Sequence, residues 1–83
     1  MAFRIEYKSS VTRDLKHLDK KAVERVLRAI SDTLSKDPRA GEALHGEFSG
    51  LYKLRVGDYR IVYTVLQESV LILRIGHRSK VYG

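Results

Sequence analysis

The last third of the chain carries side chains that can bind and polarise a phosphate group. Residues 51–83 hold six basic residues and only two acidic ones, so this segment carries +4 of the total net charge of +6. The basic residues are Lys53, Arg55, Arg60, Arg74, Arg78 and Lys80. Guanidinium and ammonium groups that converge on one phosphate stabilise the charge that develops when the phosphorus is attacked. The residue types are therefore those of a phosphate-binding or phosphodiester-cleaving site.

The charge and composition also limit the class of protein. A net charge of +6 favours nucleic acid as the partner, because each phosphate that Lys or Arg neutralises releases condensed counterions. The 83 residues predict a single domain spanning residues 1–83, and the absence of Cys fits a reducing cytoplasm. No apolar run approaches the roughly 18 residues of a membrane span, and residues 1–8 lack the apolar stretch of a signal peptide.

We expect neither a metal nor a cofactor. His17 and His45 have no Cys or acidic partners at the spacings of metal ligands. The parity of His77 in an extended strand predicts that its side chain points inward, as a structural residue.

The first half of the chain predicts a strand followed by two antiparallel helices. Apolar and charged residues alternate over residues 3–8, which is typical of a strand with one buried face. The hydroxyls of the Ser9-Ser10 pair are placed to cap a helix that runs to about Leu18. Asp19 caps a second helix with one apolar stripe, which Asp37-Pro38 ends because the residue before proline avoids helical backbone angles.

The second half predicts three consecutive strands after a connecting loop at residues 39–50. These segments are rich in Val, Ile, Leu and Tyr and lie at residues 51–56, 59–66 and 70–76. The intervening Gly57-Asp58 pair is typical of a two-residue hairpin turn. The predicted fold class is α+β, in the order β-α-α-β-β-β, with the helices on one face of a three-stranded antiparallel meander.

A two-residue turn fixes which strand residues share a face. It places Arg55 opposite Arg60 and Lys53 opposite Val62, so three cations point to the same side of the sheet. Opposed like charges destabilise a strand pair by up to about 1 kcal/mol, which indicates a functional reason for the pair. The opposite face, which is predicted to pack on the helices, carries Tyr52, Leu54, Val56, Tyr59, Ile61 and Tyr63.

The next hairpin decides whether the later arginines join this face. A three-residue loop at residues 67–69 would set Val62 opposite Arg74 and Thr64 opposite Ile72, and it would place Arg74 and Arg78 with the other cations. Leu71, Leu73 and Ile75 would then enter the core. A two-residue loop would reverse the parity and scatter the arginines.

Three segments resemble the RelE/ParE superfamily of bacterial and archaeal toxins, most closely its RelE branch. They are residues 52–55, residues 57–63 with the sequence Gly-Asp-Tyr-Arg-Ile-Val-Tyr, and residues 75–82, which begin Ile-Gly-His-Arg. The resemblance covers essentially the whole chain. It implies a ribosome-dependent endoribonuclease that cuts messenger RNA in the decoding site and is neutralised by an antitoxin. The implied partners are a cognate antitoxin, messenger RNA, and the ribosome with the 16S rRNA of its A site.

The resemblance assigns the catalytic roles to Lys53, Arg55, Arg60, Arg78 and Tyr82. In RelE-like enzymes these residues promote attack of a ribose 2′-hydroxyl on the adjacent phosphate, which leaves a cyclic phosphate and a 5′-hydroxyl. Arg55 stands where better-known members have a second lysine, and a guanidinium is a poor base, so Lys53 is the expected proton acceptor.

The other members of the set have different expected roles. Arg60 and Arg78 would hold the phosphate, and Tyr82 would stack on a base or orient the 2′-hydroxyl. Arg74 and Lys80 are expected to bind RNA without taking part in the chemistry.

Two other functions fit the same residues. A ParE-like toxin would inhibit DNA gyrase by protein contact, but it has no evident need for Lys53, Arg60, Arg78 and Tyr82 together. A non-catalytic RNA-binding domain would show salt-sensitive binding without cleavage.

Overall fold

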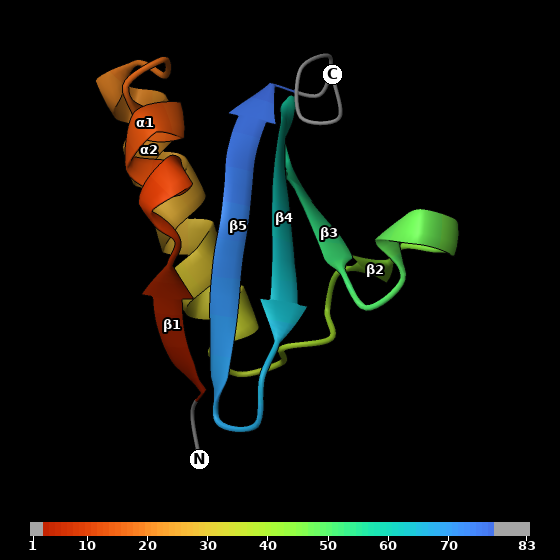
Figure 1. The fold of residues 1–83 in the computed structure, drawn as a ribbon. Helices are drawn as coiled ribbons and strands as arrows, with labels where there is room; N and C mark the ends of the chain where they lie inside the picture. Colours follow the sequence, from red (N-terminus) through yellow and green to blue (C-terminus); the bar gives the residue numbers. More distant parts are fainter. Residues whose placement is uncertain (1–2, 78–83) are drawn as a thin grey trace.

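The structure is a computed structural model that describes residues 3–77, so Arg78, Lys80 and Tyr82 lie outside the described residues. It contains one five-stranded sheet with helices on one side (Figure 1). The elements are β1 (Arg4–Tyr7), α1 (Ser9–Leu15), α2 (Lys20–Ala29), the π-helical turn η1 (Ile30–Leu34), β2 (Glu42–Ala43), the 3₁₀ turn η2 (Gly46–Phe48), β3 (Tyr52–Val56), β4 (Tyr59–Val65) and β5 (Ser69–His77). None of the helices within residues 3–77 is long and apolar enough to cross a membrane.

The sheet has the strand order β1-β5-β4-β3-β2, in which β1 runs parallel to β5 and the other neighbours are antiparallel. The predicted α+β class and the β3-β4-β5 meander are confirmed. The sheet is mixed, however, because the N-terminal strand returns to the far edge of the meander beside β5. The two-residue strand β2 lies within the segment that the sequence predicts as a loop.

The core forms where the apolar stripe of α2 and η1 packs on the inward face of the sheet. Val26, Ile30 and Leu34 are fully buried from the helical side. Ile61 and Tyr63 are fully buried from β4, as the alternation predicts. Burial of each such side chain stabilises the fold by about 1.5–3 kcal/mol. This layer covers the inward face of the sheet, and the cations of β3 and β4 lie on the opposite, outward face.

One of the two predicted helix caps is confirmed and the other is wrong. Asp19 caps α2, since its Oδ1 accepts a hydrogen bond from the Ala22 amide at 2.8 Å. At α1 the N-cap residue is Lys8, without a side-chain hydrogen bond, and the helix ends at Leu15 rather than at about Leu18. The Ser10 hydroxyl instead donates to the Leu73 carbonyl of β5 at 2.9 Å. Ser10 therefore joins α1 to the sheet.

The β4–β5 hairpin differs from the prediction in two places that compensate each other. The turn has two residues, because the Leu66 amide donates to the Ser69 carbonyl at 2.8 Å. A two-residue turn alone would reverse the parity of β5. A β-bulge between Val62 and Tyr63 restores it, since Val62 pairs with Arg74 whereas Tyr63 pairs with Ile72, which leaves one extra residue on β5.

The bulge changes which β5 residues enter the core. Ahead of it, Val70 and Ile72 are fully buried, and after it Ile75 is buried. The predicted core positions of Leu71 and Leu73 are therefore wrong, because the tight turn places both on the outward face, where they are half-buried.

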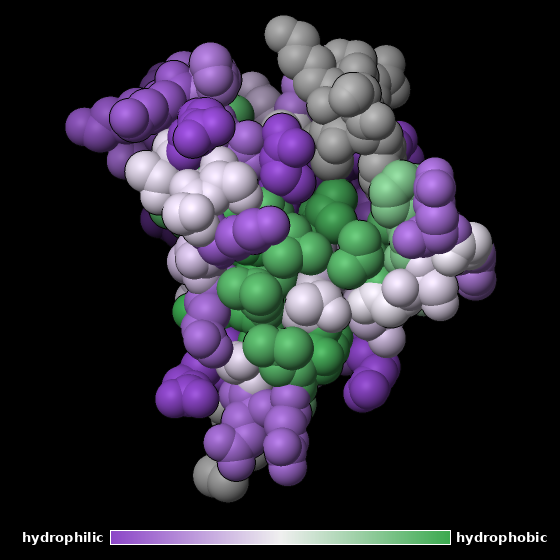
Figure 2. Space-filling model, in the orientation of Figure 1, coloured by the Kyte–Doolittle hydropathy of each residue, from purple (hydrophilic) through white to green (hydrophobic). Residues whose placement is uncertain are grey.

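The outward face of the sheet has no helix over it in the part of the chain that is described (Figure 1). Apolar atoms gather at the centre of the visible face and hydrophilic side chains border it (Figure 2). The register places Val62, Thr64 and Leu71 on this outward face. Among the described residues the face therefore has an apolar centre, where Val62 is only 6% exposed.

Candidate functional site

The predicted cations within the described residues lie on the outward face in two rows that cross the strands. The first row runs from β2 to β5 and contains Glu42, Lys53, Val62 and Arg74. The second row contains Arg55, Arg60 and Gly76. The structure thus brings Lys53, Arg55 and Arg60 together on one face. Arg74 is on the same face, two strands away from Lys53.

Arg55 and Arg60 face each other directly across the β3–β4 hairpin, as predicted. The two-residue turn that joins their strands has Gly57 at a φ of 60°, a left-handed angle that glycine adopts without strain. Arg55 is exposed and Arg60 is half-buried. Two arginines paired on adjacent strands carry the guanidinium donors that suit a phosphate.

Lys53 has a charged neighbour that the sequence does not reveal. Its Nζ lies 3.5 Å from Oε2 of Glu42 on β2, and the Lys53 side chain is only 18% exposed whereas that of Glu42 is 75% exposed. Lys53 therefore lies beside a carboxylate as well as on the same face as Arg55 and Arg60. The pair places a cation and a carboxylate side by side at the edge of the outward face.

Gly41 holds β2 close enough for this pair to form. Its amide donates to the hydroxyl of Tyr63 at 3.0 Å, and a Cβ at this position would lie 2.6 Å from both the Lys53 carbonyl oxygen and the Tyr63 hydroxyl. The Tyr63 ring is fully buried and stacks on Tyr52 at a centroid distance of 5.4 Å. Burial raises the pKa of Tyr63, so the hydroxyl remains a neutral acceptor for Gly41.

Arg74 is held by an aspartate from α1. Arg74 Nε donates to Asp14 Oδ2 at 3.0 Å, and Arg74 Nη2 donates to Asp14 Oδ1 at 3.3 Å. Asp14 Oδ2 also accepts from the Ile75 amide at 3.0 Å. Together with Ser10, Asp14 supplies partners to the edge of β5 beyond the end of β1. The charge of Arg74 is therefore balanced by Asp14.

Glu42 and Asp14 are the two site residues that the sequence analysis missed. Glu42 lies in a strand of two residues, too short to show an alternating pattern. Asp14 is 60 positions from Arg74, so no local spacing connects them. A weak signal is that Asp14 stands between the bases Arg13 and Lys16 in a short amphipathic helix.

His77 lies on the inward parity, as predicted, yet it is exposed at the end of β5. It pairs with Tyr59 across the strands, and the two rings meet edge to face with centroids 6.1 Å apart. Within residues 3–77 no three His, Asp or Glu side chains are grouped closely enough to hold a metal ion.

Comparison with known proteins gives the family. A family model described as the ParE toxin of the type II toxin–antitoxin system parDE matches residues 5–82. The chain belongs to the RelE/ParE family of toxins. Within this family it is 32% identical over 85 residues to toxin RelG of Mycobacterium tuberculosis, a match that covers 99% of this chain and 98% of RelG. It is 30% identical over 83 residues to toxin RelE of the same organism, covering 96% and 86% of the two chains.

Solved structures of RelE/ParE toxins share the fold. A toxin chain in the toxin–antitoxin complex RelBE2 of M. tuberculosis has a TM-score of 0.88 and 30% identity, and the match covers 94% of this chain and all of that chain. A chain in the archaeal RelE–RelB complex of Pyrococcus horikoshii has a TM-score of 0.74 and 27% identity, with 96% and 99% coverage. The resemblance drawn from residues 52–82 is confirmed, and the fold of the sheet with it.

Proposed function

We propose that this RelE/ParE toxin is a ribosome-dependent endoribonuclease that cuts messenger RNA in the ribosomal A site. The observation that carries the proposal is the Arg55–Arg60 pair, because two arginines directly opposite each other on the outward face of the sheet cost stability and suit a phosphate. RelE toxins are among the relatives, which supports the nuclease over other RNA-binding functions.

The proposed chemistry uses the ribose of the substrate as its own nucleophile. The 2′-oxygen loses its proton and forms a bond to the adjacent phosphorus, the bond from phosphorus to the 5′-oxygen breaks, and the 5′-oxygen gains a proton. The products are a 2′,3′-cyclic phosphate and a 5′-hydroxyl. Arg60 and Arg55 stabilise the phosphorane charge, together with Arg78, so the reaction is metal-independent. Tyr82 orients or stacks on the substrate.

We assign the acceptance of the 2′-proton to the Lys53–Glu42 pair. The two groups lie 3.5 Å apart at the edge of the basic face, and either an amine or a carboxylate can serve as a general base. Two conservative variants separate them. Lys53→Arg keeps the charge but removes the basic amine, whereas Glu42→Gln keeps the size but removes the carboxylate. The variant that loses cleavage while RNA binding is retained identifies the base.

The function is tested by incubating programmed ribosomes with the protein and mapping the 3′ and 5′ ends of the message. Cuts confined to the A-site codon, with cyclic phosphate ends, are expected. Arg60→Ala should slow single-turnover cleavage by about 10²-fold or more if Arg60 stabilises the phosphorane. Intact message would contradict the proposal, and binding to ribosomes without cuts would indicate a non-catalytic RNA-binding domain.

A second candidate is favoured by the family model, which is named for ParE toxins. A ParE-like toxin would inhibit DNA gyrase through protein contact. The discriminating measurement is a gyrase supercoiling assay with the purified toxin. Inhibited supercoiling together with intact message would favour this candidate.

We also propose a cognate antitoxin as the physiological partner, acting in the cytoplasm. The solved relatives from M. tuberculosis and P. horikoshii are complexes of toxin with antitoxin. The outward face suits such a partner, since Leu71 and Leu73 are half-buried beside the cations. An antitoxin with an amphipathic helix and acidic residues would cover both. Hydrogen exchange of the complex should show protection over β4 and β5.

A further inference from the structure

Among the described residues, no strand lies beside the second half of β5 on its α1 side. β5 spans Ser69–His77, and β1 pairs only with residues 69–72 of it. The backbone amides and carbonyls of a strand edge need partners, and an edge without them frays. This stretch also contains Gly76, and glycine weakens a strand because it loses much conformational freedom on folding. Residues 73–77 therefore need other groups to hold them in place.

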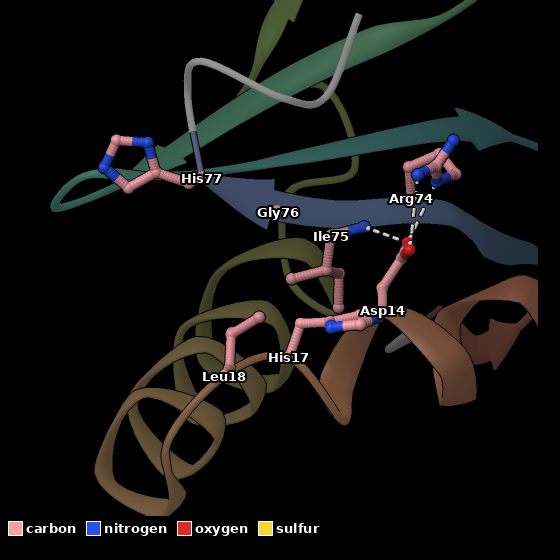
Figure 3. Close-up of a pocket in the computed structure, with 7 residues that line it drawn as sticks. All are labelled: Asp14, His17, Leu18, Arg74, Ile75, Gly76 and His77. Carbon is pink, nitrogen blue, oxygen red and sulfur yellow. Dashed lines mark hydrogen bonds and ion pairs between the residues drawn. The ribbon is translucent and has the colours of Figure 1, made fainter. Parts of the chain in front are cut away.

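Two side chains of α1 bind the backbone of this stretch. Ser10 Oγ donates to the Leu73 carbonyl at 2.9 Å, and Asp14 Oδ2 accepts from the Ile75 amide at 3.0 Å. Ser10 and Asp14 are four residues apart, so they lie on the same face of the helix. In Figure 3, Asp14 reaches from α1 to the edge of β5, where dashed lines join it to Ile75 and Arg74. A helix thus supplies the donor and the acceptor that a neighbouring strand would supply.

Asp14 holds β5 through three hydrogen bonds. Besides the Ile75 amide, its carboxylate accepts from Arg74 Nε at 3.0 Å and from Arg74 Nη2 at 3.3 Å. The Asp14 side chain is only 11% exposed. A carboxylate so shielded from water is strongly disfavoured unless donors compensate it, and two consecutive residues of β5 provide them. The contact therefore fixes the backbone of β5 at Ile75 together with the side chain of Arg74.

The segment that Asp14 holds lies between two residues to which the proposed function assigns the chemistry. Gly76 pairs with Arg60 of β4. His77 is the last described residue, and Arg78 follows it directly in the sequence. Consecutive Cα atoms are about 3.8 Å apart, so the path of β5 at residues 75–77 determines the point from which the chain continues to Arg78.

We propose that Asp14 is a positioning residue of the nuclease, which acts by holding the Ile75 amide and thereby fixing the end of β5 beside Arg60. This inference rests on the proposed function. It adds to that function a residue of α1 that acts through β5 and takes no part in the chemistry.

Loss of this contact should slow the chemical step without weakening binding to the ribosome. Stabilisation of a phosphorane depends on where its donors lie, and a displacement of about 1 Å can cost about 10²-fold in rate. Asp14→Ala removes the acceptor of all three hydrogen bonds. It should slow single-turnover cleavage at saturating ribosomes by about tenfold or more. The half-saturating ribosome concentration should change by less than about twofold, because no basic residue is removed.

Two further variants separate positioning from a general loss of stability. Asp14→Asn keeps a side-chain oxygen for the Ile75 amide and should cleave within about threefold of the wild-type rate. Ser10→Ala is the matched control, because it removes the other hydrogen bond between α1 and the edge of β5 but leaves the Ile75 amide bound. It should be destabilised and yet cleave within about twofold of the wild-type rate.

Two measurements on the free protein accompany the cleavage assay. Urea denaturation establishes the conditions under which every variant is folded. Amide exchange followed by NMR reports the contact itself, and the Ile75 amide should exchange about tenfold or more faster in Asp14→Ala than in Asp14→Asn.

The outcomes separate this inference from the nuclease proposal. Slow cleavage by Asp14→Ala at saturating ribosomes, with recovery in Asp14→Asn and near-normal cleavage by Ser10→Ala, would support it. Equal slowing by Asp14→Ala and Ser10→Ala, no recovery in Asp14→Asn, a change confined to the half-saturating ribosome concentration, or wild-type cleavage by Asp14→Ala would overturn it and leave the nuclease standing. A wild-type protein that leaves the message intact would overturn both.

Discussion

Replacing Arg55 by threonine should stabilise the fold while it weakens cleavage. Arg55 is exposed and lies directly opposite Arg60, and opposed like charges destabilise a strand pair by about 0.2–1 kcal/mol. A gain of about 0.5 kcal/mol would raise the melting temperature by roughly 2–4 °C for a domain of this size. Salt screens exposed charges, so the gain should shrink as the ionic strength rises.

Arg4→Thr is the matched control for Arg55→Thr. Arg4 is exposed in a strand and faces Ser69 instead of a cation, so the control removes the same charge and adds the same β-branched residue. The assays are urea denaturation at two salt concentrations and single-turnover cleavage on programmed ribosomes. Arg55→Thr should exceed the control in stability and fall below it in cleavage. A variant that is no more stable than Arg4→Thr, or that cleaves as well, would refute the view that this pair is retained for function.

Three further changes test how the site is supported. Because burial raises the pKa of Tyr63, the unfolded chain loses the hydroxyl proton at a lower pH than the folded protein does. The free energy of unfolding should therefore fall above pH 10 by up to about 1.4 kcal/mol per pH unit. Denaturation at several pH values measures this slope, and Tyr63→Phe should remove the part of it that comes from Tyr63. Gly41→Ala should destabilise the fold by about 1–3 kcal/mol in urea denaturation, since its Cβ would meet the Lys53 carbonyl at 2.6 Å. Ser10→Ala leaves the Leu73 carbonyl without its hydroxyl donor and should cost about 1–3 kcal/mol by the same measurement, with equal stability as the contrary result.

The part of the site that the sequence predicts correctly is the part fixed by local geometry. The Gly57-Asp58 turn joins β3 and β4 with two residues, so the pairing of Arg55 with Arg60 follows from residues that are close in the chain. Asp19 caps α2 for the same reason, since its hydrogen bond spans three residues. These features need no knowledge of distant packing.

The position of Arg74 was predicted correctly for a reason that the structure contradicts. The expected three-residue loop is a two-residue turn, and the parity is restored by a β-bulge opposite Val62. A bulge depends on how β5 packs between β4 and β1, and no local residue pattern specifies it. The two-residue turn is also the reason that Ile72, and not Leu71 as predicted, enters the core.

The contacts that sequence reasoning could not reach join distant segments. Asp14 meets Arg74 across 60 positions, and Glu42 meets Lys53 through a strand of two residues. Both contacts alter the charge around a predicted site residue. The sequence therefore predicts which cations share a face and that Arg55 lies opposite Arg60, whereas only the fold shows that Lys53 and Arg74 have carboxylate partners.

The most direct test of the proposed site is the single-turnover rate of message cleavage on programmed ribosomes for the wild-type toxin, Arg60→Ala and the control Arg4→Ala. If Arg60 stabilises the phosphorane, the wild-type protein and Arg4→Ala cut the A-site codon at similar rates, and Arg60→Ala is slower by about 10²-fold or more with its fold intact. Equal rates for all three proteins, or a message that stays intact with the wild-type toxin, would contradict the assignment of RNA cleavage to the outward face of this sheet.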